Sequence, residues 1–387
     1  MPTFDDLPKP KPHALARSRK LVTYLRDEMA KAGGSISFER YMADALYHPT
    51  LGYYTSPDFT IGPRGDFTTA AELTPLYAQC MANTCATVFR ELTEPAILEI
   101  GAGSGQFAVD LLQALHALNA LPTRYFIHEI SPALRDQQAE KLKQHCPQWL
   151  NRIEWCDTLP QFEGMIIANE VLDALPVHCF EMNNEAIYER RVTFADQAFA
   201  WTLTPPTPSL KQALNELTDL SSHTQGEMNL QYAGFIKTLA NCLTRGLMLF
   251  ADYGYGRPLL YHPARVRGTL TCFYQHHHHD NPLILPGLQD ITAHVDFTRV
   301  AEAGVAAGCD LAGFTTQAAF LLESGLTSLI VAAEQPLNEK EKFKLHQAVK
   351  TLTLPTEMGE VIKIMGLTKG IEHRLAGMSM ADRRGEL

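Results

Sequence analysis

The chain has 387 residues, 45% of them hydrophobic, and a formal net charge of −10 at neutral pH. This length exceeds one ordinary domain and allows a sizeable core, while the negative charge excludes a general attraction to nucleic acid or to an anionic membrane. No stretch approaches the roughly 18 apolar residues of a membrane span, and residues 1–20 lack the apolar centre of a secretory signal.

The first 94 residues are predicted to form an N-terminal region of helices and loops. A helical pattern covers 15–32, and Ser37 is a candidate N-cap for a second helix. The polar, aromatic and glycine-rich stretch 52–69 predicts a long loop. A third helix is expected at 75–89, opened by a threonine and a proline.

From residue 95 the pattern alternates between short apolar strands and helices. Alternation with short loops is typical of a parallel sheet with right-handed crossovers and helices on both faces. The sequence therefore predicts an α/β, Rossmann-like core that extends over 95–387. The predicted strands are 96–100, 124–129, 152–156, 165–168 and 247–251, and the first predicted helices are 106–118 and 132–145.

Three additions to this core are expected. A β-hairpin beside the fourth strand, at 178–203, and a helical insertion together occupy about 178–245. A long loop on the substrate side, 253–294, follows the fifth strand, and loops of that length are usually functional or covering elements. C-terminal helices and two strands, at 309–315 and 360–364, are predicted to close the sheet as an antiparallel edge.

The glycine turn after the first predicted strand is a signal for a ligand site. Gly101, Gly103 and Gly105 follow an apolar strand with Glu99 near its end, and a helical pattern begins directly after them. In this geometry backbone N–H groups and a helix N-terminus face a ligand. A carboxylate at this place suits the ammonium and sulfonium of S-adenosylmethionine better than a pyrophosphate. Gln106, where a dinucleotide turn has its third glycine, also argues against a nicotinamide dehydrogenase.

Polar residues end the following strands as well. Glu129 is placed to accept hydrogen bonds from a ribose diol and Asp157 from an adenine amino group, and Asn169 is a further cofactor-binding candidate. In open α/β sheets the ligand lies outside the carboxyl ends of the strands, where these residues fall. Each residue alone is equally explained by the exposure of loops to solvent, so the prediction rests on the whole series.

Glu170 and Asp173 are candidates for holding the substrate. They are three residues apart, so on a helical turn both carboxylates share one face. Two carboxylates can hold a guanidinium through paired hydrogen bonds, and arginine keeps its charge in proteins, so the pair would act by orienting the planar group. The alternative is a solvated helix start, where the helix dipole favours acidic residues. Methyltransferases that act on amino or amide groups often carry an Asn-Pro-Pro-Tyr-like sequence at this place. Its absence here argues against an amide as the methyl acceptor.

Four consecutive histidines, at 276–279, invite interpretation as a metal site. Alternate side chains of an extended segment point apart, so the four cannot all face one ion. A solvated loop is therefore favoured and no metal site is predicted, while a substrate-facing role for one of the histidines stays open.

Several motifs together resemble the MidA-like family of class I S-adenosylmethionine-dependent methyltransferases. That family includes the mitochondrial complex I assembly factor that makes symmetric dimethylarginine. The resemblance covers nearly the full length of the chain. Its most specific motifs are 65–69 and 290–297, and the stretches 99–105 and 169–176 match as well.

This resemblance implies roles for residues that the patterns alone do not assign. Gly65, Asp66, Thr68 and Glu72 would bind the cofactor in a segment that folds over it as a lid. His294, with Asp296 close by, would lie near the substrate channel, and we count His294 among the catalytic candidates. The family also implies a protein substrate that presents an arginine, such as a respiratory complex I subunit.

The sequence thus predicts a protein arginine methyltransferase that uses S-adenosylmethionine. Methylation of a small molecule, and an assembly factor that binds the cofactor without catalysis, remain alternatives. Eight scattered cysteines, none in a C-x-x-C pair, predict reduced residues in a cytoplasmic protein. The substrate sequence, the degree of methylation and the oligomeric state are not predicted.

Overall fold

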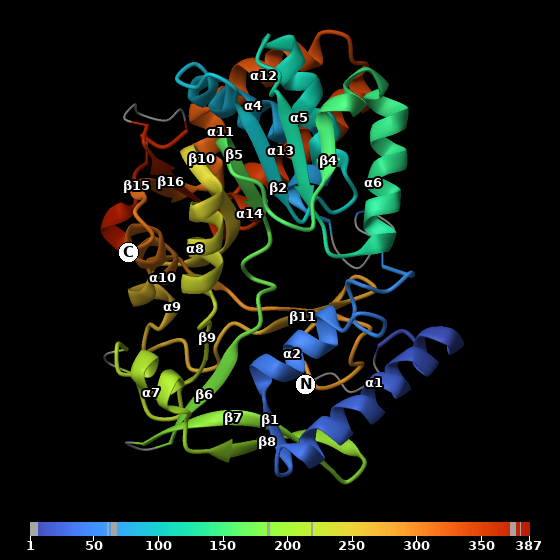
Figure 1. Ribbon diagram of the computed structural model, residues 1–387, viewed down its shortest axis with the longest axis vertical. Helices are drawn as coiled ribbons and strands as arrows, with labels where there is room; N and C mark the ends of the chain where they lie inside the picture. The colour runs from blue at the N-terminus through green and yellow to red at the C-terminus, as the bar shows by residue number, and fades with distance from the viewer. Residues whose placement is uncertain are drawn as a thin grey trace. The chain divides into compact units, whose positions relative to one another are not determined.

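A computed structural model of the chain describes residues 7–59, 62, 68–183, 186–217, 220–371, 377–379 and 381–387. The chain divides into two compact units, and Figure 1 labels most of their helices and strands. This division differs from the predicted boundary after residue 94, because the helix Pro75–Phe89 shares a core with the strands of unit 2. Unit 1 comprises Met1–Phe67, Asp173–Tyr232 and Arg257–Asp296, and unit 2 comprises Thr68–Leu172, Ala233–Gly256 and Phe297–Leu387.

Unit 2 is built on a mixed sheet with the strand order β15-β16-β10-β5-β2-β3-β4. The pairs among β10, β5, β2, β3 and β4 are parallel, and β16 and β15 form the predicted antiparallel edge. The predicted α/β fold is therefore confirmed. The strands are β2 (Ala96–Ile100), β3 (Arg124–His128), β4 (Ile153–Trp155), β5 (Phe162–Asn169), β10 (Leu243–Tyr255), β15 (Asp310–Thr316) and β16 (Ile362–Lys369).

The helices α4 and α6 of unit 2 begin where local signals place them. Thr74 caps α4 by accepting a hydrogen bond from the N–H of Leu76, and Ser131 caps α6 in the same way, with a proline next in each case. Apolar residues of α4 and α5 pack with β2 and β5 in one buried core. The helices include α3 (Ala70–Leu73), α4 (Pro75–Phe89), α5 (Gln106–Ala117), α6 (Pro132–His145), α8 (Tyr232–Cys242), α10 (Phe297–Ala306), α11 (Gln317–Glu323), α12 (Leu326–Glu334), α13 (Glu339–Thr353) and α14 (Met358–Val361).

Unit 1 contains two further sheets and the N-terminal helices. The first sheet has the order β1-β7-β6-β9, with β8 paired to β7, and the second has the order β12-β11-β13. Ser37 caps α2 as predicted, accepting a hydrogen bond from the N–H of Arg40 at 3.1 Å. The elements are α1 (Pro12–Lys31), β1 (Ser35–Ser37), α2 (Phe38–Tyr47), β6 (His178–Asn183), β7 (Ala186–Ala195), β8 (Ala198–Thr204), α7 (Pro208–Leu214), β9 (Gln225–Met228), α9 (Arg257–Leu260), β11 (Thr271–Tyr274), β12 (His277–His279) and β13 (Asp290–Thr292).

The prediction that a hairpin at 178–203 lies beside the fourth strand of the core is wrong. Its residues form β6, β7 and β8 of unit 1, where β7 pairs with β1 and β6 pairs with β9. Three-residue β1 and four-residue β9 are too short to show a periodicity, so the sequence did not reveal this sheet. The predicted loop 253–294 likewise contains α9 and the strands β11 to β13. Among the described helices, none combines the length and hydropathy needed to cross a membrane.

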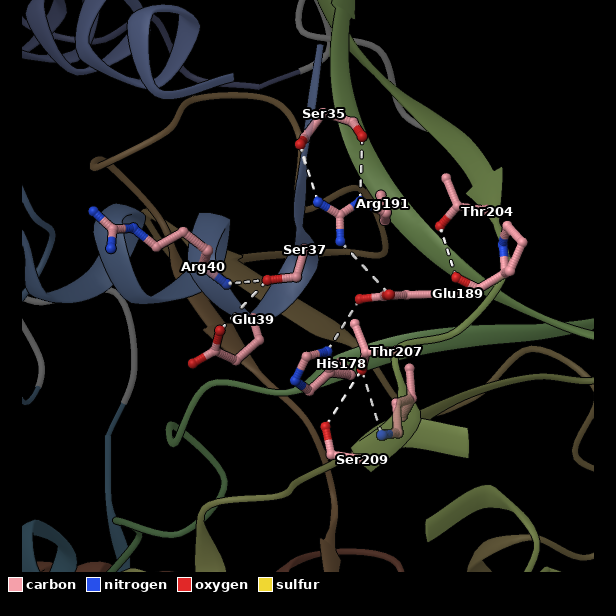
Figure 2. Close-up of polar contacts among 12 residues, drawn as sticks. Ser35, Ser37, Glu39, Arg40, His178, Glu189, Arg191, Thr204, Thr207 and Ser209 are labelled. Atoms are coloured by element: carbon pink, nitrogen blue, oxygen red, sulfur yellow. Dashed lines mark hydrogen bonds and ion pairs between the residues drawn. The ribbon is translucent and has the colours of Figure 1, made fainter. Parts of the chain in front are cut away.

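A buried carboxylate links three strands of the first sheet, as Figure 2 shows. Glu189 of β7 is 1% exposed, with its Oε1 3.2 Å from Nδ1 of His178 on β6. Its Oε2 lies 3.6 Å from Nη1 of Arg191, and Nη2 of the same guanidinium donates to the backbone oxygen of Ser35 on β1 at 3.0 Å. The charge of Glu189 therefore compensates the largely buried guanidinium of Arg191.

Replacing Glu189 by alanine is expected to lower the free energy of unfolding by about 2–4 kcal/mol, because Arg191 loses its buried counter-charge. Calorimetric unfolding of the variant measures this loss as a lower midpoint. The control is Glu339→Ala, which removes an exposed carboxylate paired with Lys342 at 3.0 Å, and which we expect to cost less than about 1 kcal/mol. Equal midpoints for the two variants would contradict the assignment.

Candidate cofactor and active site

The glycine turn of unit 2 lies between β2 and α5 and adopts a backbone that favours glycine. Gly101, Gly103 and Gly105 have φ values of 67°, 54° and 78°, in the left-handed region. Gly101 donates its N–H to the backbone oxygen of His128 at 2.9 Å, at the end of the neighbouring strand β3. Gly105 is the N-cap of α5. The predicted strand, turn and helix are therefore present, with the N-terminus of α5 at the carboxyl end of the sheet.

Gln138 of α6 is a buried residue at this turn that the sequence did not single out. Its Nε2 lies 2.9 Å from the backbone oxygen of Gly103 and 3.1 Å from Oε2 of Glu129, and donates to both. Its Oε1 accepts a hydrogen bond from the indole of Trp155 at 2.9 Å. Gln138 thus fixes the glycine turn relative to the ends of β3 and β4.

Glu99 lies on β2 with its side chain buried. Its Oε2 accepts a hydrogen bond from the hydroxyl of Tyr125 at 2.7 Å. Burial raises the pKa of the Glu99 carboxyl to about 7, and the nearby charge of Glu129 adds to this rise, although the Tyr125 hydrogen bond opposes it. A buried carboxylate with such a pKa is stabilised by a cation that enters its surroundings, which agrees with the predicted preference for a cationic ligand.

Glu99→Gln is expected to stabilise the cofactor-free protein at high pH and not at low pH. Folding raises the pKa of the Glu99 carboxyl from 4.5 to about 7. The free energy of unfolding therefore falls as the pH rises from 4.5 to 7, and above pH 7 the protein bears the full cost of burying the ionised carboxylate. The variant should be about as stable as the parent at pH 4.5 and up to about 3 kcal/mol more stable at pH 8. Urea unfolding at both pH values measures the difference, and a difference independent of pH would contradict the assigned pKa.

Glu129 follows β3 and is also buried. Its Oε1 accepts a hydrogen bond from the N–H of Ser131 at 2.9 Å, and burial raises the pKa of its carboxyl. Its predicted role, accepting hydrogen bonds from a ribose diol, stays a prediction, and Gln138 provides the second support that such a carboxylate needs to keep its orientation.

Asp157 follows β4, and its side chain is exposed to solvent. The guanidinium of Arg135 donates a hydrogen bond to Asp157 and another to the backbone oxygen of Glu129. The hydrogen bond from Arg135 lowers the pKa of the Asp157 carboxyl. Arg135, which the sequence did not mark, thus bridges the ends of β3 and β4. The predicted contact of Asp157 with an adenine amino group stays a prediction.

Glu72 of α3 contacts the glycine turn through Ser104. The hydroxyl of Ser104 donates to Oε1 of Glu72 and accepts a hydrogen bond from Nζ of Lys141 at 2.9 Å. Of the predicted lid residues, Thr68 is half-buried, while Gly65 and Asp66 lie outside the described residues. The start of α3 is therefore tied to the predicted cofactor site.

Asn169, the last residue of β5, and Glu170, which follows it, take part in a connected set of polar contacts. The hydroxyl of Tyr77, a buried residue of α4, donates to Oδ1 of Asn169. Nδ2 of Asn169 and the backbone N–H of Ala70 both donate to Oε1 of Glu170, each at 3.2 Å. Asn169 thus supports the side chain of Glu170, and its predicted contact with the cofactor stays a prediction.

The helical turn expected at Glu170 is absent. The residues after β5 form bends and turns, and Glu170 has a φ of 53°, which a helix does not contain. The spacing argument that places Glu170 and Asp173 on one helix face is therefore wrong, because the backbone reverses its handedness at the first of the two residues.

Asp173 and His294 belong to unit 1, whereas Glu170 belongs to unit 2. Within unit 1 the backbone oxygen of Asp173 accepts a hydrogen bond from the N–H of Ala293 at 2.9 Å, so the two predicted segments lie side by side. The N–H of His294 donates to Oγ1 of Thr269 at 3.0 Å. The catalytic roles of Asp173 and His294 stay predictions from the sequence.

The histidine run lies in a β-hairpin rather than in an open loop. β12 pairs with β11, and His279 is buried opposite Cys272, whereas His277 and His278 are exposed. Burial lowers the pKa of His279. Across the described residues, no group of three histidine, cysteine or acidic side chains has the arrangement of a metal site.

The residues at the carboxyl ends of β2, β3 and β5 fit S-adenosylmethionine. Two buried carboxyls with raised pKa values, Glu99 and Glu129, accompany a turn rich in backbone donors. Such carboxyls match ammonium, sulfonium and hydroxyl groups, while a pyrophosphate would add negative charge beside them.

Known proteins agree with this interpretation. A family model described as S-adenosyl-L-methionine-dependent methyltransferase matches residues 80–315. A solved structure from Burkholderia thailandensis, described as a methyltransferase bound to S-adenosyl-homocysteine, is 39% identical, covers 98% of this chain and 100% of its own, and superposes with a TM-score of 0.95. The mitochondrial protein arginine methyltransferase NDUFAF7 homolog of Drosophila melanogaster is 27% identical over 94% of this chain and 89% of its own, and human NDUFAF7 is 28% identical over 87% and 81%.

These matches, which span more than half of the chain, establish a class I methyltransferase that uses S-adenosylmethionine as its cofactor. Within that class, the chain belongs to the MidA-like family.

Proposed function

We propose that this methyltransferase acts on arginine side chains of a protein, and that a respiratory complex I subunit is among its substrates. The arginine methyltransferases named above support the substrate class, at 27% and 28% identity. The observation that carries the proposal is the position of Glu170, which directly follows β5 beside the glycine turn. A side chain placed at Gly101 would come within 3.4 Å of Val171, the next residue after Glu170.

The chemistry follows from this position. The cofactor supplies an electrophilic methyl group on a sulfonium. Glu170 accepts N–H groups of the substrate guanidinium, holds its plane and draws positive charge toward the bound nitrogens, so that the remaining nitrogen attacks the methyl group in line. The new N–C bond forms as the C–S bond breaks, the sulfur keeps the electron pair, and the substrate nitrogen loses a proton.

Asp173 is proposed as the second carboxylate that binds the guanidinium, and His294 as the residue that receives the proton. The product expected from the family resemblance is symmetric dimethylarginine. Cytoplasmic location stays a prediction, and the named curated relatives are mitochondrial proteins.

The experiment combines the purified protein, S-adenosylmethionine with a labelled methyl group and a purified complex I subunit. Acid hydrolysis of the labelled product followed by chromatography should give methylated arginines. In a parallel assay with a small-molecule cell extract, label on an extract compound other than the cofactor would favour the alternative enzyme. No label on either acceptor, with retained cofactor binding, would favour an assembly factor that works by binding alone.

A further inference from the structure

Asp252 is a buried carboxylate that none of the roles above includes. It lies near the carboxyl end of β10, next to β5, and is 0% exposed. Its Oδ2 accepts hydrogen bonds from the N–H groups of Val171 at 3.0 Å and Leu172 at 2.7 Å. Its Oδ1 accepts a third, from the N–H of Tyr253 at 2.9 Å. A charged acceptor thus serves three backbone donors at the end of the sheet.

The backbone that Asp252 holds is strained at Glu170. A φ of 53° in a glutamate is unfavourable by about 1–2 kcal/mol relative to the right-handed region, and such a residue persists when its surroundings determine its conformation. Three hydrogen bonds hold the backbone in this conformation. The N–H of Glu170 donates to the backbone oxygen of Ala251 at 2.8 Å, and Asp252 binds the next two N–H groups.

The segment that follows β5 also lies close to the glycine turn. A Cβ placed at Gly101 would lie 3.4 Å from Cγ2 of Val171. The residues after β5 therefore lie against the glycine turn, with their N–H groups turned toward Asp252. A shift of this segment would move Glu170 relative to the turn, and displacements of about 1 Å are enough to reduce catalysis strongly.

Backbone and side chain of Glu170 have separate supports. Asp252 fixes the backbone, whereas Asn169 and Ala70 bind Oε1 of the carboxylate, and Tyr77 in turn donates to Asn169. The two supports come from different elements, β10 for the backbone and α3 with α4 for the side chain.

We propose that Asp252 is a positioning residue for methyl transfer, which holds Glu170 in its left-handed conformation at the edge of the cofactor turn. The proposal rests on the role of Glu170 in the proposed function. It assigns no contact between Asp252 and either cofactor or substrate.

Asp252→Asn tests this proposal, because an amide of nearly equal size keeps one acceptor oxygen and replaces the other with a donor that repels the N–H groups. We expect kcat to fall by about 10- to 100-fold. The affinity for S-adenosyl-homocysteine, measured by calorimetry, should stay within about threefold of the parent, because the glycine turn itself is unchanged. Asp44→Asn, at a buried carboxylate of unit 1 paired with Arg40 at 2.7 Å, is the matched control, with kcat expected to stay within about threefold.

A double-mutant cycle separates positioning from a general loss of structure. In the Glu170→Gln background, Asp252→Asn should lower kcat by no more than about threefold further, since the group it positions is already gone. If the two losses multiply, or if cofactor affinity falls as much as kcat, Asp252 has a structural role only and the proposal is wrong. Tyr77→Phe weakens the support of the Glu170 side chain more mildly, because it removes only the hydroxyl that donates to Asn169. We expect it to lower kcat by about 3- to 10-fold.

Failure of the proposed function gives a different result. In that case the unmutated enzyme makes a product other than methylarginine, or the single variant Glu170→Gln keeps full activity. Neither result depends on Asp252.

Discussion

Glu170→Gln is expected to lower methyl transfer to arginine by about 100-fold or more, with little change in cofactor affinity. The amide cannot neutralise a guanidinium, and its NH₂ group points donors at a group that is itself only a donor. Loss of a charge-assisted contact at the reacting group typically costs about 3 kcal/mol in the transition state. The measurement is the rate of label transfer from S-adenosylmethionine at saturating substrate, together with calorimetric titration of S-adenosyl-homocysteine.

The same strand offers a matched control. Glu163 lies at the opposite end of β5, where its Oε1 accepts hydrogen bonds from the N–H groups of Thr93 and Glu94, each at 2.6 Å. Glu163→Gln should leave the rate within about threefold of the parent. A Glu170→Gln variant as active as this control would remove the clamp from the mechanism.

Gly105→Val is expected to weaken cofactor binding by at least about 100-fold. Its φ of 78° is one that a β-branched residue rarely adopts, and a Cβ would lie 3.2 Å from Cγ and 3.3 Å from Cα of Gln138. Since Gln138 supports both the glycine turn and Glu129, its displacement changes two parts of the cofactor site together. Calorimetric titration of S-adenosyl-homocysteine measures the loss.

Gly308→Val separates backbone strain from this local crowding. Gly308 has a φ of 82°, yet a Cβ there would meet nothing within 4 Å. Both variants should lose stability, but only Gly105→Val should lose cofactor affinity. Equal affinities for the two variants would contradict the assigned position of the cofactor.

The sheet of unit 2 could be predicted because its signals are local. The strand β2 is a short buried run that is mostly apolar, and the helices α4 and α6 start at a capping residue followed by proline. The sheet of unit 1 could not be predicted in the same way. Its strand β1 has three residues, and its partner β7 follows more than a hundred residues later, so nothing local indicates the pairing.

The candidate site shows the same limit. The glycine turn was predictable, because its residue type reports the backbone conformation directly. Gln138 and Arg135 lie on α6, a mostly polar helix, among similar polar residues, and only tertiary contacts distinguish them. The left-handed backbone at Glu170 was likewise hidden, since glutamate there depends on hydrogen bonds from β10.

The central claim, transfer of methyl groups to protein arginine, is tested most directly by mass spectrometry of cellular proteins. Cells that carry the gene, cells that lack it and cells complemented with Glu170→Gln would be compared after proteolytic digestion, which keeps each methylated arginine in a peptide of its own protein. The account predicts symmetric dimethylarginine on a complex I subunit in the first cells and its absence in the other two. Unchanged methylarginine in all three would contradict it.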